Sequence, residues 1–236
     1  TILRLLNGQE AADRPLPPMA VLAGLSVLQS LILFGIAAAV GTALAPGAGL
    51  GAPFFEALAH GAPLGPAIAP QWLPALAVGI PGALIFIAAY YWWFRPRLDT
   101  LTVQRMEALR NSLGVAGRLL YGGIAEEVLT CWGLLTLLAW LGVKVAGSPT
   151  PAVMWGAIVV AGALFGLGHA PGYLAAGCQK SPMFFAAMIS LNLWASLIFG
   201  WLFWQAGLVA AMMGHMLFHL VWLPFDLHYY EPVEAM

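Results

Sequence analysis

Five ionisable side chains lie inside apolar segments of this sequence, where charge is costly and a functional role is a common reason to keep it. Glu126 and Glu127 are adjacent, and His169, His215 and His219 follow in later apolar segments. A carboxylate in a low-dielectric site can act as a general base or acid, and imidazoles can take up or donate protons beside it. These residue types therefore indicate acid–base or metal-assisted chemistry.

The spacing of these residues suggests different roles for them. Neighbouring helical positions point about 100° apart, so we expect one of Glu126 and Glu127 to face a cavity and the other to bind a neighbouring helix. His215 and His219 are four residues apart and share one helix face, which suits a metal pair or two groups aimed at one carbonyl. Simple interhelical hydrogen bonds remain an alternative for the glutamates, for this pair and for His169.

The composition is that of a membrane protein. Of 236 residues, 61% are hydrophobic and 8% are charged, and the net charge is −1. A soluble domain has about 25% charged residues, so a water-soluble globule is excluded. Disorder and nucleic-acid binding are excluded as well, because the chain lacks both high net charge and a basic face. We expect an all-α polytopic membrane protein that forms a single membrane domain over residues 1–236.

Six segments are apolar and long enough to cross a bilayer, which takes about 20 residues. Gly and Pro punctuate the breaks between the later segments, as helix ends require. The segment 46–70 is rich in Gly, Pro and Ala, and we interpret it as a re-entrant or surface loop. The six predicted helices lie near 19–45, 71–94, 119–142, 152–171, 183–204 and 207–226.

The basic residues predict the orientation. With the N-terminus inside, only Lys144 falls on the outer side, so both termini are expected in the cytoplasm. The basic stretch 95–118 spaces apolar residues at helical intervals and is typical of an amphipathic helix on the inner leaflet, although a basic loop would share its composition. Eight residues fall on the cytoplasmic side: Arg4, Arg14, Arg95, Arg97, Arg105, Arg110, Arg118 and Lys180.

This topology brings the five ionisable residues to one depth. The glutamates lie roughly 11 Å into the third span from its cytoplasmic end. His169 lies near the inner end of the fourth span, and His215 and His219 lie in the middle to inner part of the sixth. We therefore expect a single site in the cytoplasmic half of the membrane. Other polar residues are interpreted differently: Asp226 lies near a helix end, and Gln29, Asn192 and Gln205 are read as packing contacts.

The order of these residues resembles the CPBP family of intramembrane proteases, which includes the type II CAAX prenyl endopeptidases and bacteriocin-processing proteins. The first motif of that family is EExxxR, which Glu126 and Glu127 match, with Cys131 at the arginine position. The second is FxxxH, which Phe165 and His169 match. The patterns of zinc site-2, rhomboid-like and aspartyl intramembrane proteases are absent from the sequence.

The third family motif is HxxxN or HxxxD. His215 matches its histidine, and His219 stands where the amide or acid is usual. The resemblance covers about 119–226, a core of four helices, while the first two helices are matched by hydropathy alone.

The resemblance implies a mechanism of peptide hydrolysis. Glu126 would activate a water molecule, assisted by His169. His215 and His219 would hold the oxyanion or position the substrate, and Glu127 would orient its neighbours. Family members have been described both as metal-independent and as metalloproteases. The resemblance therefore leaves two alternatives: the reaction requires no cofactor, or Glu126 and the three histidines bind zinc.

Cys131 and the missing arginine leave alternatives open. Cys131 lies on the face of Glu127 and is either a packing residue or a nucleophile. A non-catalytic family member that scaffolds a membrane complex is a second function, and a metal or haem site on the histidines is a third. The interpretation that we favour is an endopeptidase that cleaves a membrane-anchored protein or peptide. We expect it in a bacterial or archaeal cytoplasmic membrane. The substrate, its prenylation and the oligomeric state stay open.

Overall fold

The computed structural model describes residues 18–230, and within that part of the chain every regular element is a helix. Six helical stretches are long and apolar enough to cross a membrane, which confirms the all-α polytopic fold. The elements are α2 (Met19–Ala48), α3 (Pro53–Ala59), α4 (Leu64–Ala88), η2 (Ala89–Phe94), η3 (Arg95–Arg97), α5 (Thr100–Ser112), α6 (Gly114–Gly117), η4 (Arg118–Glu126), η5 (Val128–Leu135), α7 (Thr136–Ala146), α8 (Pro151–Ala175), α9 (Pro182–Ala206) and α10 (Leu208–Tyr229).

Local sequence signals set the helix ends. The hydroxyl of Thr150 accepts a hydrogen bond from Val153 N at the start of α8, and Ser181 caps α9 in the same way. Gly49 ends α2 in the left-handed conformation, with φ at 70°. Gly207, with φ at 109°, forms the tight turn between α9 and α10.

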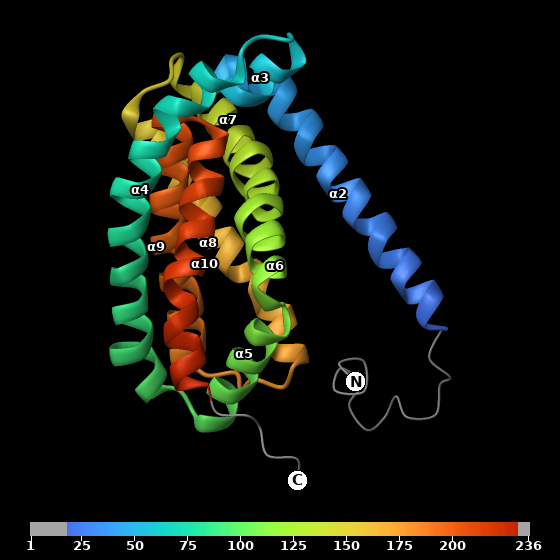
Figure 1. The fold of residues 1–236 in the computed structure, drawn as a ribbon, viewed down its shortest axis with the longest axis vertical. Helices are drawn as coiled ribbons and strands as arrows, with labels where there is room; N and C mark the ends of the chain where they lie inside the picture. Colours follow the sequence, from blue (N-terminus) through green and yellow to red (C-terminus); the bar gives the residue numbers. More distant parts are fainter. Residues whose placement is uncertain (1–17, 231–236) are drawn as a thin grey trace.

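Five of the six spans form a bundle (Figure 1). α4, α8, α9 and α10 lie side by side with the rod that runs from α6 through α7. Small residues allow close helix contact: an added methyl at Gly79 would come within 3.2 Å of Gly214 Cα, and one at Gly162 within 2.7 Å of Ser196 Cβ. This close packing holds the inner faces of the helices in fixed positions.

The first span, α2, joins the bundle only through its C-terminal half. It contacts η5 and α7, where Gly47 faces the Trp140 ring. Its N-terminal half leans away from the other helices in Figure 1, and its large apolar side chains are exposed there. Leu25, Leu28 and Leu31, for example, are all exposed.

Two stretches differ in detail from the sequence-based expectation. Residues 46–70, interpreted as a loop, contain the end of α2, the short helix α3 and the start of α4. Within the stretch 95–118, α5 lies across one end of the bundle, and its buried face carries Glu107 and Arg110 beside apolar residues. Much of the basic charge therefore faces protein rather than the membrane surface. Arg4 and Arg14 lie outside the described residues.

The third span carries an uncommon backbone. η4 and η5 are π-helical, with i→i+5 hydrogen bonds, and Glu127 lies at the junction between them. π-Helices are rare, and they occur frequently at functional sites. Because a π-helix turns less per residue than an α-helix, it changes which side chains face the bundle interior around Glu126 and Glu127.

Candidate functional site

A cavity of about 560 Å³ lies among η4, α8, α9 and α10, and α5 closes one end of it. Four of the sequence-predicted site residues line it, namely Glu126, His169, His215 and His219. These come from three separate spans, so the fold gathers side chains that are up to 93 positions apart in the sequence. The remaining lining is mostly apolar, and its polar members include Asn192, which the sequence analysis took as a packing residue.

Glu127 and His215 form the shortest polar contact between predicted site residues. Glu127 Oε1 lies 2.7 Å from His215 Nδ1, and both side chains are buried. Since an ionised carboxylate only accepts, the proton is on Nδ1, which leaves Nε2 of a neutral ring as an acceptor. Phe199 stacks on the same ring at 4.4 Å, so His215 is held from two sides.

Glu126 faces the other nitrogen of the same histidine. Its Oε2 lies 4.0 Å from His215 Nε2, which is too long for a direct hydrogen bond. One water molecule can bridge two acceptors at this separation with bonds of ordinary length. The Glu126 side chain is 16% exposed and lines the cavity, whereas Glu127 is 2% exposed and does not.

His169 occupies the cavity wall on α8. Its Nδ1 lies 2.9 Å from the carbonyl oxygen of Phe165, which can only accept, so Nδ1 carries the proton. Nε2 of the neutral ring is then unprotonated and available as a proton acceptor. Phe165 also packs edge-on against the ring, which fixes its orientation.

His219 stacks on His215 with ring centroids 4.9 Å apart. Both of its ring nitrogens are buried and have no hydrogen-bond partner among residues 18–230. The ring lies against Gly122 of η4, where a side-chain methyl would come within 3.0 Å of Cδ2 and closer still to Nε2. A neutral imidazole always has one N–H, so His219 has a donor that no described protein group uses.

Cys131 is not among the residues that line the cavity. It is 4% exposed and lines a separate small pocket with Glu127, behind the cavity wall. The two residues thus share a side of the third span, as their spacing suggested. A thiol in this place does not face the cavity that Glu126 faces, which leaves the packing role as the one that its surroundings favour.

The donors for a metal ion do not converge. Within residues 18–230, no group of three or more His, Cys, Asp or Glu side chains is arranged so that it could hold one. The Nδ1 atoms of His169 and His215 are engaged by protein oxygens, so each ring could bind a metal ion only through Nε2. Zinc binding by Glu126 and the three histidines stays a prediction, which the effect of a strong chelator on activity tests.

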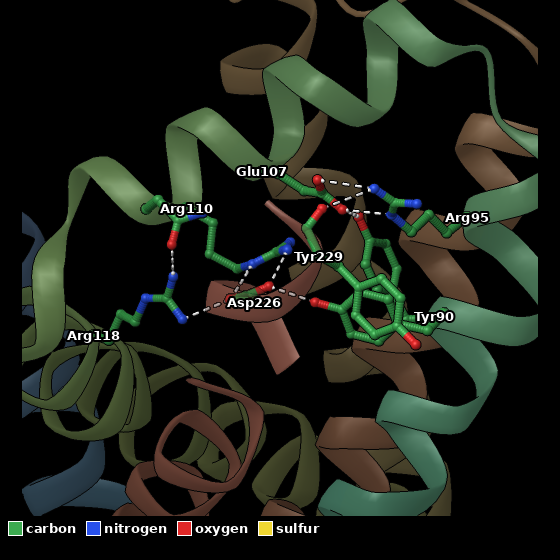
Figure 2. A network of polar contacts seen from close by, with 9 residues as sticks. Tyr90, Arg95, Glu107, Arg110, Arg118, Asp226 and Tyr229 are labelled. Atoms are coloured by element: carbon green, nitrogen blue, oxygen red, sulfur yellow. Dashed lines mark hydrogen bonds and ion pairs between the residues drawn. The ribbon is translucent and has the colours of Figure 1, made fainter. Parts of the chain in front are cut away.

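Sequence analysis missed a buried ionic cluster at the α5 end of the cavity (Figure 2). Asp226 accepts hydrogen bonds from Arg110 at 2.8 and 2.5 Å, from Arg118 at 2.6 Å and from Tyr91 at 2.8 Å. Arg118 also donates to Asn111 at 2.7 Å. Both arginines line the cavity, and both are at least nine-tenths buried. The sequence analysis noted only that Asp226 lies near a helix end. Most of the arginines were predicted on the same side of the membrane as this acid, and that coincidence was the signal for the ion pairs.

A second ion pair continues this network. Arg95 Nε lies 2.8 Å from Glu107 Oε1, to which Tyr90 also donates at 3.1 Å. Arg110 lies over the Tyr90 ring at 5.2 Å and so joins the two pairs. Burial lowers the pKa of Arg110, but the charge of Asp226 helps to hold it well above the usual value. Arg110 therefore stays protonated.

Comparison with known proteins gives one family match. Residues 109–221 match the family model described as type II CAAX prenyl endopeptidase Rce1-like. The matched segment begins in α5 and ends in α10, and it contains every sequence-predicted site residue. It confirms the resemblance to the CPBP family that the motifs indicated. Comparisons with curated proteins and with solved structures found no match.

Proposed function

We propose that this protein is an intramembrane endopeptidase, because residues 109–221 match the Rce1-like family model. Its substrate is a membrane-anchored protein or peptide, cut near the cytoplasmic leaflet. The observation that carries the proposal is the cavity wall that Glu126 shares with three histidines from two other spans.

Glu126 is the general base of the proposed reaction. A water molecule between Glu126 Oε2 and His215 Nε2 donates a hydrogen bond to each, and its oxygen attacks the peptide carbonyl carbon. Glu126 takes the proton that the water loses, and later gives it to the nitrogen of the leaving amine as the carbon–nitrogen bond breaks. Glu127 supports this step by fixing the His215 ring through Nδ1.

His219 is the best placed of the three histidines to stabilise the tetrahedral oxyanion. His169 and His215 use the N–H of their neutral rings on protein oxygens, whereas the N–H of His219 has no such partner in the described chain. Both His219 nitrogens are buried in the free protein, so the proposed role requires that the ring turn toward the cavity when the substrate binds. His169 Nε2 can hold a proton transiently beside Glu126.

The cytoplasmic location rests on charge. Arg105 donates to the carbonyl oxygen of Gly177, so α5 and the α8–α9 loop lie at the same end of the bundle, and Lys180 lies in that loop. Lys144 lies near the C-terminal end of α7, at the opposite end in Figure 1. The excess of Lys and Arg at the α5 end supports a cytoplasmic assignment for it.

A processing assay in membranes tests the proposal. We would compare membrane peptidomes of cells with and without the protein, and then assay the candidate substrates with wild type and with Glu126→Gln. Removal of a general base typically costs about 10²–10⁴-fold in rate. Glu56→Gln is the matched control, since Glu56 lies on α3 away from the cavity. Each reaction would be run with and without a strong zinc chelator.

The outcomes separate the candidate functions. An uncut precursor that accumulates with Glu126→Gln but not with Glu56→Gln supports the peptidase, and unchanged cleavage under the chelator supports the metal-independent route. If no product of any candidate depends on Glu126, the catalytic proposal fails. The protein would then be treated as a membrane scaffold and examined for stable partners.

A further inference from the structure

The cavity wall formed by α8 and α9 carries two uncharged polar side chains that the proposed mechanism does not use. Tyr173 of α8 and Asn192 of α9 both line the cavity. The wall around them is largely apolar, with Phe165, Met188 and Leu191 among its members. A few polar groups in an apolar lining are what fixes the orientation of a ligand in a binding pocket. We therefore considered what these two side chains could bind.

Tyr173 offers the cavity a hydrogen-bond donor. Its hydroxyl has no hydrogen-bond partner within residues 18–230, and neighbouring atoms do not seal it off. The ring stacks on His169 with centroids 6.4 Å apart, and it packs edge-on against Phe184 at 6.3 Å. Because these contacts fix the ring, the hydroxyl oxygen is held at a defined place on the wall.

Asn192 offers the cavity an acceptor. Its Nδ2 donates to the carbonyl oxygen of Met188 at 2.8 Å. Because a carbonyl oxygen only accepts, this contact identifies the nitrogen end of the side-chain amide. The other end, Oδ1, has no partner in the described part of the chain and is not sealed off either. The wall thus presents a donor at Tyr173 and an acceptor at Asn192.

The two groups lie at different depths, on either side of His169. A methyl added at Gly166 would come within 3.3 Å of Asn192 Cβ, so Asn192 lies level with Gly166. Tyr173 follows seven residues later on α8, about 10 Å along the helix, and His169 lies between the two levels. About three extended residues of a peptide cover that distance. Across the cavity, the charge of Glu126 acts on both His169 and Tyr173.

A peptide main chain supplies the groups that this wall can bind. Every residue except proline carries one N–H donor and one carbonyl acceptor, and neither is charged. We propose that Tyr173 and Asn192 bind the main chain of the substrate, one on each side of the bond that is cut. Tyr173 donates to a peptide carbonyl oxygen, and Asn192 Oδ1 accepts from a peptide N–H. This inference rests on the proposed peptidase function and describes how its substrate is bound.

The arrangement fixes how the substrate lies. The peptide is extended along the α8–α9 wall, and the scissile bond lies beside His169, about one or two residues from each contact. The two side chains hold the main chain and not a particular side chain of the substrate. The sequence of the substrate is therefore read elsewhere in the cavity.

Binding to a protein that cannot cleave tests this arrangement. The probe is an N-terminally fluorescein-labelled, C-terminally amidated peptide of Ala and Leu, about six residues long so that it spans both contacts. Its anisotropy is measured with purified Glu126→Gln protein in detergent. A second probe carries the same side chains joined by ester bonds, so it keeps the carbonyl groups and lacks every N–H between residues. We expect the peptide to bind about tenfold more tightly than the ester chain, the effect of one hydrogen bond.

Two variants assign the hydrogen bonds. Asn192→Leu should weaken binding of the peptide about tenfold and leave the ester chain unaffected, because the ester chain has no N–H for Oδ1 to accept. Tyr173→Phe should weaken binding of both probes, because both have carbonyl oxygens. Tyr229→Phe and Gln205→Leu are the matched controls, since both residues are exposed and neither lines the cavity. The controls should leave all affinities unchanged.

The results decide between main-chain recognition and purely apolar contact. Unchanged affinities in both variants, or no binding of either probe at millimolar concentration, overturn the proposal. A loss with Asn192→Leu that is equal for the two probes refutes the role of Oδ1, and unchanged binding with Tyr173→Phe refutes that of the hydroxyl.

Folding and cleavage are separated from this test. Thermal unfolding shows whether each variant is folded, and Tyr173→Phe, which removes an oxygen without a protein partner, decides the proposal if Asn192→Leu does not fold. Because no cleavage is needed, main-chain binding can fail while Glu126-dependent processing stands, and the reverse.

Discussion

Replacing Gly122 by alanine tests whether the position of the His219 ring matters, because the substitution displaces the ring and leaves the imidazole itself unchanged. The added methyl group would lie within 3.0 Å of His219 Cδ2 and closer still to Nε2. Ordinary contact needs about 3.5–4 Å, so the ring must move by about 1 Å. The substitution changes no charge and removes no polar group.

The expected loss of activity follows from that displacement. A misplacement of about 1 Å in a catalytic group can lower the rate about 10²-fold. Folding should not suffer to the same degree, because the obstructing atoms belong to a side-chain end that can rotate away. Alanine also favours the helix over glycine by about 0.5–1 kcal/mol. We therefore expect Gly122→Ala to lower kcat/KM about 10²-fold with little change in thermal stability.

The assay combines substrate cleavage with a double-mutant cycle. Gly156→Ala is the matched control, since nothing lies within 4 Å of an added methyl at that position on α8. If Gly122→Ala acts through His219, it should have almost no further effect in a His219→Ala background, where the ring that it displaces is gone. Thermal unfolding of the four proteins of the cycle and of the Gly156→Ala control shows whether they are folded.

Two results would refute this reasoning. Wild-type activity of Gly122→Ala would mean that the position of His219 is unimportant for the reaction. An equal loss of activity with and without His219 would mean that Gly122 acts through the backbone of η4 instead.

Two further predictions concern stability and thiol reactivity. Glu107→Gln leaves Arg95 without its buried partner and should lower the free energy of unfolding by about 1–3 kcal/mol. The loss is smaller than for a fully buried pair because the Arg95 side chain is a quarter exposed. An unchanged thermal midpoint, with Glu56→Gln as the control, would contradict this prediction. Burial raises the pKa of the Cys178 thiol to about 11, so roughly one thiol in a thousand is the reactive thiolate at pH 8. Maleimide labelling of Cys178, followed by mass spectrometry, should therefore be slow and rise about tenfold per pH unit, and rapid labelling at pH 7 would show that the thiol is not buried.

The spans were predictable because the requirement for about 20 apolar residues is strong and local. Segment 46–70 was harder, because Gly and Pro are read as loop formers although proline fits well in a first helical turn. Pro53 begins α3 in this way. The π-helical backbone of η4 and η5 could not be read from hydropathy, because the apolar pattern that predicts a span does not distinguish an α-helix from a π-helix.

The part of the site that was predictable consists of charged or polar residues that are unfavourable in an apolar membrane segment. Glu126 and the histidines stood out because charge and polarity are rare in apolar segments. The pairing of Arg110 and Arg118 with Asp226 joins residues more than 100 positions apart, and basic residues near a membrane face are ordinarily explained by topology alone. Their burial depends on how α5 folds back over the bundle, which is a tertiary feature.

The tilt of α2 has a consequence for the membrane in which the protein works. Its apolar span of 26 residues is about 39 Å long, whereas the hydrocarbon core of a bilayer is about 30 Å thick. A helix of that excess length can relieve the mismatch by tilting. Because only its C-terminal half is fixed to η5 and α7, the free half follows the lipid. A thicker bilayer would draw α2 upright, toward the bundle, and a thinner one would splay it outward, so lipid chain length sets the angle of this helix.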